Sequence, residues 1–138
     1  MNTNLDSMMQ RCPDAVRLGP AELLNHRFRF AFHADVVPCT GSTVHGLLWL
    51  ITPKCLTSLD RLEGFPSYYD RNWVEVRYAH SVFLALTYYM TPGNLDAPPP
   101  NSYFELVMDG YVDNNIRDHQ LTLALNQTLH YQTDKWTL

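Results

Sequence analysis

Apolar and polar residues recur along the chain with two different periods, which predict a set of strands and a set of helices. Alternation with a period of two predicts strands at 26–33 and 72–78, and the segment 81–90 predicts a second strand that pairs with 72–78 as a hairpin. The run "VHGLLWLIT" at 44–52 is apolar almost throughout, which predicts a buried strand in the centre of the sheet. The strand at 26–33 would bury the face that carries Phe28, Phe30 and Phe32.

Apolar residues at helical spacing predict four helices, and capping residues place their ends. One helix begins after Thr52, which can cap its first turn, and ends at Gly64, which supplies a left-handed stop. Gly19-Pro20 and the turn-rich segment 38–43 are interpreted as breaks between elements. The remaining helices are expected within 1–11, 102–111 and 118–130.

This order of elements predicts an α+β fold. A mainly antiparallel, curved sheet or small β-barrel would be flanked by short helices. The chain has 138 residues, of which 46% are hydrophobic and 17% charged, a composition typical of a globular protein. We therefore expect a single domain over residues 1–138.

Charge excludes two classes of partner. The formal net charge is −4 and Lys and Arg form no run, so the sequence offers no electrostatic surface for nucleic acid or for an anionic membrane. No apolar segment reaches the roughly 18 residues of a membrane span, and the polar start of the chain does not resemble a signal peptide. A small-molecule partner and a cytoplasmic location are expected, while the oligomeric state is left open.

The cysteines and histidines do not predict a metal site. Cys12, Cys39 and Cys55 are odd in number and form no CxxC pair, so we interpret them as reduced thiols, mostly in the core. The six histidines show no paired ligand spacing, and no local base or charge activates a cysteine. We expect neither a metal nor a cofactor.

Glu63 is the main candidate for chemistry. Most glutamates at the end of a helix are simply solvated, so its position alone does not assign it a role. Its neighbours matter more, because Gly64, Phe65, Pro66 and the pair Tyr68-Tyr69 could form the wall of a partly apolar cavity around the carboxylate.

Three segments, in order, resemble the gamma-glutamylcyclotransferase-like superfamily, which includes AIG2-like and gamma-glutamylamine cyclotransferases. The segment "LDRLEGFPSYYDR" followed by "WVEV" resembles its LDxxEG signature. "APPPNSYFELVMDG" resembles a Pro-rich loop leading into a helix with a pocket-facing aromatic, here Tyr103, and "NLDSMMQRCPDA" resembles an earlier segment. Together the resemblance covers about residues 1–117. The signature positions are Leu59, Asp60, Glu63, Gly64, Tyr69 and Arg71.

The resemblance implies a reaction and a set of site residues. The α-amine of a γ-glutamyl group would attack its own γ-carbonyl, form 5-oxoproline and expel an amine or amino acid, with Glu63 as general acid and base. Asn2 and Thr3 would bind the glutamyl group through a turn, and Tyr69 and Tyr103 would shape the pocket and offer hydroxyls. No cofactor or metal is implied.

The sequence departs from the family pattern at its start. The family opens with a strand that ends in a Tyr-Gly-x-Asn loop, and here Asn2 aligns with the last residue of that loop, while Asn4 is an alternative. Tyr-Gly and the first strand are absent, so we expect that adding a short strand ending in Tyr-Gly would raise solubility and activity. Two classes of function stay open: an active cyclotransferase, or a catalytically reduced relative that binds a small ligand or a protein.

Overall fold

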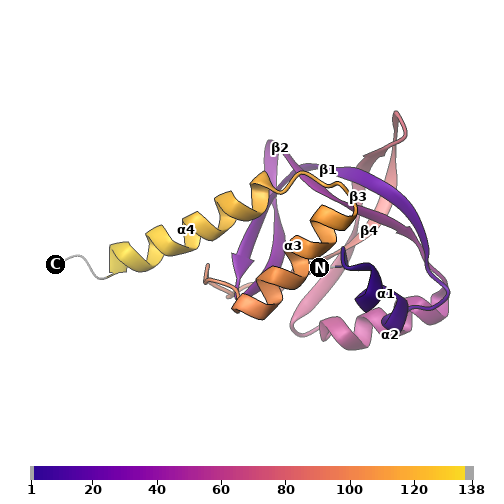
Figure 1. Ribbon diagram of the computed structural model, residues 1–138, viewed down its shortest axis with the longest axis horizontal. Helices are drawn as coiled ribbons and strands as arrows, with labels where there is room; N and C mark the ends of the chain where they lie inside the picture. Colours follow the sequence, from indigo (N-terminus) through magenta and orange to yellow (C-terminus); the bar gives the residue numbers. More distant parts are fainter. Residues whose placement is uncertain (1, 136–138) are drawn as a thin grey trace.

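The fold is an α+β arrangement of four helices and a curved four-stranded antiparallel sheet, as predicted (Figure 1). The computed structural model describes residues 2–135, with side chains through residue 129. The elements in chain order are α1 (Leu5–Arg11), β1 (Val16–Ala31), β2 (His33–Leu50), α2 (Pro53–Glu63), β3 (Tyr69–Tyr78), β4 (Ser81–Met90), α3 (Asn101–Asp113) and α4 (His119–Lys135).

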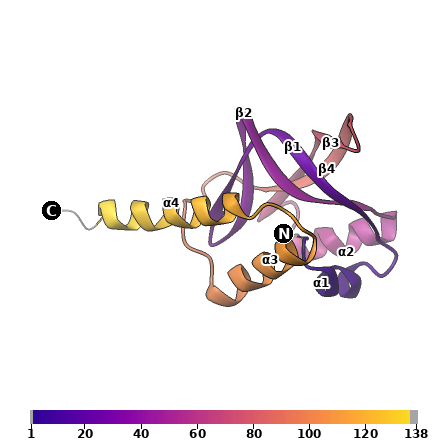
Figure 2. The ribbon, with the colours of Figure 1, turned by 45° about the horizontal axis from the view of Figure 1, so that its top comes forward.

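The sheet consists of two hairpins in the order β2-β1-β3-β4. The β3–β4 hairpin is paired over its whole length, and Ala79 and His80 form its tight turn with positive φ values of 50° and 66°. This hairpin was predicted correctly. The strand pairing that joins the two hairpins is limited to Glu22 and Leu23 of β1, which pair with β3. Short contact between two long, twisted hairpins gives the sheet its strong curvature, which Figure 2 shows from a second side.

The β1–β2 hairpin corrects the predicted breaks. Gly19-Pro20 lies inside β1, where the pairing register shifts between Arg17 and Gly19, and the segment 38–43 lies inside β2 opposite a second shift. Such irregularities accommodate Gly and Pro within a strand that would otherwise be interrupted. One long hairpin therefore replaces the predicted turns.

Two further predictions about this hairpin were wrong. The apolar run at 44–52 lies mostly in β2, which is an edge strand and not a central one, because β2 pairs with β1 alone. Its apolar residues line a cavity. Phe32 does not share the buried face of Phe28 and Phe30. It occupies the turn between β1 and β2, with a positive φ of 66°, and is 52% exposed.

A disulfide joins Cys12, which follows α1, to Cys55 in the first turn of α2, with their Cα atoms 5.0 Å apart. The prediction of reduced thiols is therefore wrong for this pair and holds for Cys39, which is free. The bonded cysteines are 43 residues apart in sequence, so no local spacing indicated the pairing; the packing of α1 against α2 brings them together.

The main core lies between the sheet and the last two helices. Phe28 and Phe30 of β1 pack with Val107 and Tyr111 of α3 and with Leu121 of α4. α4 begins against the sheet and then extends away from the body of the molecule (Figure 1). Within residues 2–135, no helix combines the length and apolar character needed to cross a membrane.

Candidate active site

Glu63 is the last residue of α2, and local interactions determine where that helix begins and ends. The side chain of Thr52 accepts a hydrogen bond from the backbone N–H of Cys55 (3.2 Å), and Pro53 follows at the start of the helix. Gly64 ends the helix in the left-handed conformation, with φ 65° and ψ 37°. Both predicted ends are confirmed, and they leave Glu63 half-buried beside the chain reversal that leads into β3.

Glu63 lines a cavity of about 950 Å³ that is bounded by β2 on one side and by β3 and β4 on the other. Most of the lining is apolar, with side chains such as Leu47, Trp49 and Leu86. The polar lining residues include Asn2, Thr3, Tyr69 and Arg71. The cavity thus brings four of the five predicted site residues together, whereas Tyr103 is not part of its lining.

Four tyrosines lie near enough to Glu63 for its charge to act on them: Tyr68, Tyr69, Tyr88 and Tyr103. Burial is the main factor that raises the pKa of each hydroxyl above its usual value, and the negative charge of Glu63 adds to the rise. The pKa of Tyr103 is raised to about 12. All four hydroxyls therefore stay protonated and uncharged at neutral pH.

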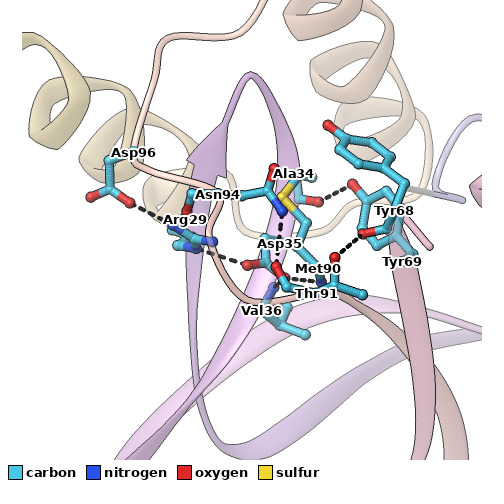
Figure 3. A network of polar contacts seen from close by, with 10 residues as sticks. All are labelled: Arg29, Ala34, Asp35, Val36, Tyr68, Tyr69, Met90, Thr91, Asn94 and Asp96. Atoms are coloured by element: carbon cyan, nitrogen blue, oxygen red, sulfur yellow. Dashed lines mark hydrogen bonds and ion pairs between the residues drawn. The ribbon is translucent and has the colours of Figure 1, made fainter. Parts of the chain in front are cut away.

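The peptide of Ala34 holds two of these tyrosines in place. The hydroxyl of Tyr69 donates to the carbonyl oxygen of Ala34 at 2.5 Å (Figure 3), and the hydroxyl of Tyr103 accepts from the backbone N–H of Ala34 at 3.1 Å. Tyr69 comes from β3 and Tyr103 from α3, so the start of β2 connects two elements that are far apart in sequence. Tyr103 therefore contacts the structure that supports the cavity.

The adjacent Asp35 is buried, with 3% of its surface exposed, and anchors this part of β2 (Figure 3). Its carboxylate accepts hydrogen bonds from the backbone N–H of Met90 at the end of β4 (2.8 Å) and from the side chain of Arg29 (2.7 Å). Arg29 also pairs with Asp96 in the loop before α3 (3.0 Å). A buried carboxylate needs such partners, and here they tie β1, β2, β4 and the loop together around Ala34.

A second acidic residue, Asp60, lies one turn before Glu63 on α2. Its Oδ1 accepts a hydrogen bond from the hydroxyl of Tyr88 on β4 (2.6 Å) and lies 3.5 Å from Nε of Arg71 on β3. The guanidinium of Arg71 also stacks over the ring of Phe65, 4.5 Å from its centroid. These contacts fix the end of α2 against the β3–β4 hairpin and thereby the position of Glu63.

His33 contacts two of the tyrosines near Glu63, Tyr68 and Tyr103. Its Nδ1 shares a hydrogen bond with the hydroxyl of Tyr68 (2.9 Å), and its ring packs edge-on against Tyr103, with the centroids 4.9 Å apart. Burial lowers the pKa of the His33 imidazole below its usual value. The ring is therefore neutral at pH 7 and can serve as either donor or acceptor to Tyr68.

The N-terminal segment is held against the cavity from several sides. Trp49 Nε1 donates to the carbonyl oxygen of Asn2 (2.8 Å), and Arg11 donates to the Asn2 side chain (3.0 Å). Thr3 is buried, with 2% of its surface exposed, yet within the described part of the chain its hydroxyl Oγ1 has no hydrogen-bond partner. A buried hydroxyl without a partner carries an energetic cost, which a bound polar ligand would remove.

The site thus combines, in a largely apolar space, a carboxylate, several uncharged tyrosine hydroxyls and one hydroxyl without a partner among the described residues. This combination suits proton transfer and the binding of a small polar molecule. Among residues 2–135, no group of three or more His, Cys, Asp or Glu side chains is arranged to hold a metal ion.

Sequence reasoning missed several residues that shape the site. Tyr88 and Trp49 were assigned only to apolar strands, and Asp35 was not singled out. Asp60 was visible in the LDxxEG signature, three residues before Glu63 and hence on the same face of the helix, which was a usable signal. For the other three, only the non-local strand pairing brings them to the site.

Residues 1–106 match the model of one protein family, "Gamma-glutamyl cyclotransferase, AIG2-like". No curated protein matches the chain in sequence.

Solved structures share the fold. The uncharacterized protein loc79017 from Homo sapiens is 24% identical, with a TM-score of 0.74 over 82% of this chain and 75% of that one. A structure named gamma-glutamyl cyclotransferase is 23% identical, with the same TM-score and coverage. YkqA from Bacillus subtilis is 20% identical, with a TM-score of 0.73 over 89% of this chain but 48% of that protein. At these identities the likeness establishes the fold alone.

Proposed function

The chain belongs to the AIG2-like gamma-glutamyl cyclotransferase family, and from this premise we propose that it cyclises a small γ-glutamyl compound to 5-oxoproline and releases an amine or amino acid. The observation that carries the proposal is the position of Glu63, whose carboxylate lines the same apolar cavity as Asn2 and Thr3. The proposed partner is this small molecule, and the reaction uses no cofactor or metal.

Glu63 is assigned the proton transfers. The α-ammonium of the substrate loses a proton to the carboxylate, and the free amine attacks the γ-carbonyl carbon to close a five-membered ring. When the tetrahedral intermediate collapses, the bond from the γ-carbon to the leaving nitrogen breaks. Two protons leave the α-nitrogen in total and both end on the leaving nitrogen, so Glu63 accepts and returns them one at a time. Atoms and charge balance without a co-reactant.

The rest of the cavity is assigned to holding the substrate. Both reacting groups belong to one molecule, so orientation alone can contribute roughly 7–11 kcal/mol to lowering the barrier. The hydroxyl of Thr3, which has no partner among the described residues, and the side chain of Asn2 can bind the glutamyl group, and the hydroxyl oxygen of Tyr69 can accept a hydrogen bond from it. The largely apolar lining lowers the local dielectric constant and so strengthens each of these polar contacts.

The Glu63→Gln variant tests the proposal. Glutamine keeps the size of the side chain and its hydrogen bonding but cannot accept the proton, so the rate of 5-oxoproline release should fall by at least roughly 100-fold. The measurement is 5-oxoproline release from a panel of γ-glutamyl amines, amino acids and peptides, together with thermal unfolding, whose midpoint should stay close to that of the unmodified protein.

The matched control is Glu75→Gln, which makes the same chemical change at an exposed position on β3 and should leave turnover unaltered. Near-normal turnover by a folded Glu63→Gln protein would remove Glu63 from the mechanism. Binding of γ-glutamyl compounds by the unmodified protein without any 5-oxoproline release would refute the proposed activity and support a binding role.

A further inference from the structure

We propose that Gly110 of α3 and Asn114, the C-cap residue of this helix, are positioning residues that set the place of Thr3 in the site. The inference rests on the proposed function in one respect, because it takes Asn2 and Thr3 as the segment that binds the glutamyl group. Both positioning residues lie beyond residues 1–106, the part of the chain that matches the family model. Figures 1 and 2 both place the short segment that leads into α1 beside α3.

Gly110 permits a very close approach of two backbones. A Cβ atom at this position would lie 2.5 Å from the carbonyl carbon of Thr3, 2.6 Å from its carbonyl oxygen and 2.7 Å from the backbone nitrogen of Asn4. These three atoms belong to the main chain and cannot rotate away, so a side chain here would force either α3 or the N-terminal segment to shift. Glycine costs helix stability relative to alanine, and this contact explains its presence in the interior of α3.

Asn114 fixes the same peptide by hydrogen bonds. Its side-chain Nδ2 donates to the carbonyl oxygens of Thr3 (2.9 Å) and Gly110 (2.8 Å), and its Oδ1 accepts from Nε of Arg17 on β1 (2.6 Å). The residue is 2% exposed, so both N–H groups of the amide are used inside the protein. Asn114 therefore links the end of α3, β1 and the carbonyl of Thr3.

The opposite side of the segment is held by the sheet and by α1. The indole N–H of Trp49 donates a hydrogen bond to the carbonyl oxygen of Asn2, and the side chain of Asn4 caps α1 by accepting one from the backbone N–H of Ser7 (3.0 Å). With the carbonyl oxygens of Asn2 and Thr3 both occupied, the hydroxyl of Thr3 remains the side-chain group of this segment without a partner among the described residues. α3 and β2 thus hold the peptides on both sides of the Thr3 side chain, so the position of this hydroxyl depends on them.

Gly110→Ala tests the role of the close approach. Displacement of Thr3 by a fraction of an ångström should raise KM for the γ-glutamyl substrate by roughly tenfold or more, since small misplacements of binding groups have effects of this size. The kcat should change much less, because Glu63 lies on α2, away from the peptide of Thr3 that Gly110 contacts. A purely structural role would instead lower the unfolding temperature and leave KM unaltered.

A second readout does not depend on activity. The indole N–H of Trp49 bonds to Asn2, so a shift of the segment should move its resonance in an ¹H–¹⁵N NMR spectrum, assigned with Trp49→Phe. If the unmodified protein makes no 5-oxoproline, the proposed function fails but this measurement still decides the positioning role. An unchanged Trp49 resonance together with an unchanged KM in Gly110→Ala would overturn the inference.

Asn114→Asp provides a second variant if Gly110→Ala does not fold. The replacement is isosteric but places an oxygen against the carbonyl oxygens of Thr3 and Gly110, so it should reproduce both the rise in KM and the shift of the Trp49 signal. The control is Asp113→Asn, which makes the reverse exchange at the neighbouring exposed position and should change neither. Equal behaviour of the two variants would contradict the proposal.

Discussion

Glu63 could be located from sequence because everything that positions it along the chain is local. Thr52, Pro53 and Gly64 act within one short helix, and each acts through its own backbone or side chain. The surroundings of Glu63 could not be located in the same way. Tyr88 and Trp49 reach the site only through strand pairing, which depends on residues far away in sequence.

Tyr69 and Tyr103 show how a residue that was singled out for binding can also be part of the framework. Each hydroxyl is engaged by the Ala34 peptide, which is buried between β1 and the aromatic residues. The sequence predicted that these rings lie near the site, but it contained no signal for their common partner. Their contribution to stability and their contribution to binding therefore have to be measured separately.

Replacement of Tyr69 by Phe should lower the free energy of unfolding by about 1–3 kcal/mol, because the buried carbonyl oxygen of Ala34 loses the donor that is now 2.5 Å away. Tyr103→Phe should have a similar effect through the backbone N–H of the same residue. Urea unfolding monitored by circular dichroism provides the measurement.

Tyr89→Phe serves as the control for both tyrosine variants, since the hydroxyl of Tyr89 bonds to Asp70 at 3.2 Å on a more exposed part of the sheet. Tyr89→Phe should lower the free energy of unfolding by much less than either of the other two replacements. If Tyr69→Phe and Tyr103→Phe were as stable as the unmodified protein, the Ala34 contacts would not stabilise the fold.

At the scale of elements, the helices and the β3–β4 hairpin followed the sequence patterns, and the β1–β2 hairpin did not. Pro38 looked like a break because proline cannot donate to a ladder, but it lies in an edge strand, opposite His26 and near a register shift. Edge position is a property of the sheet order, which pairing between distant segments determines. The predicted turn at 38–43 failed for this reason.

The disulfide between the ends of α1 and α2 belongs to the same scale. The disulfide closes a loop whose ends are 43 residues apart, and this loop contains all of the β1–β2 hairpin. The main effect of the bond should therefore be to restrict the conformations of the unfolded chain. Replacing both Cys12 and Cys55 by alanine should lower the free energy of unfolding by about 2–4 kcal/mol.

Chemical denaturation with and without a reductant measures this effect. The unmodified protein should lose stability when dithiothreitol is added, the double variant should not respond, and Cys39→Ser, which alters the free cysteine, should respond like the unmodified protein. If the reductant did not change the denaturant concentration at the unfolding midpoint of the unmodified protein, the disulfide would not stabilise the fold.

At the scale of the whole molecule, the antiparallel α+β class was predictable from the order of periodic segments, but the arrangement of the two hairpins was not. The strands of the two hairpins pair at only two positions, and no local pattern distinguishes Glu22 and Leu23 as the place of this pairing. The cavity that contains Glu63 exists because the hairpins diverge from this joint. The residues proposed for the site could thus be named individually from the sequence, while the space between them depends on the complete sheet.

The same packing predicts how stability depends on alkaline pH. Burial raises the pKa of Tyr69 and of Tyr111 well above the usual value of 10.0, and it raises the pKa of Tyr103 to about 12. The three tyrosines lie in or against more than one part of the hydrophobic core. Above pH 10 the unfolded chain loses these protons while the folded protein keeps them, so each buried tyrosine lowers the free energy of unfolding by about 1.4 kcal/mol per pH unit. The loss due to Tyr103 should end near pH 12, where the folded state also ionises, and below pH 10 none of the three contributes.

Thermal unfolding at a series of pH values, together with tyrosinate absorbance, tests this expectation. We expect the unfolding temperature to stay constant between pH 7 and about pH 10 and to fall steeply above pH 10. Part of the tyrosinate absorbance should appear only when the protein unfolds. In guanidinium, where the chain is unfolded, all eight tyrosines should ionise together near pH 10. A single titration of the folded protein near pH 10, with no loss of stability, would mean that its tyrosine hydroxyls are accessible to water. The tyrosine hydroxyls near Glu63 would then not be desolvated.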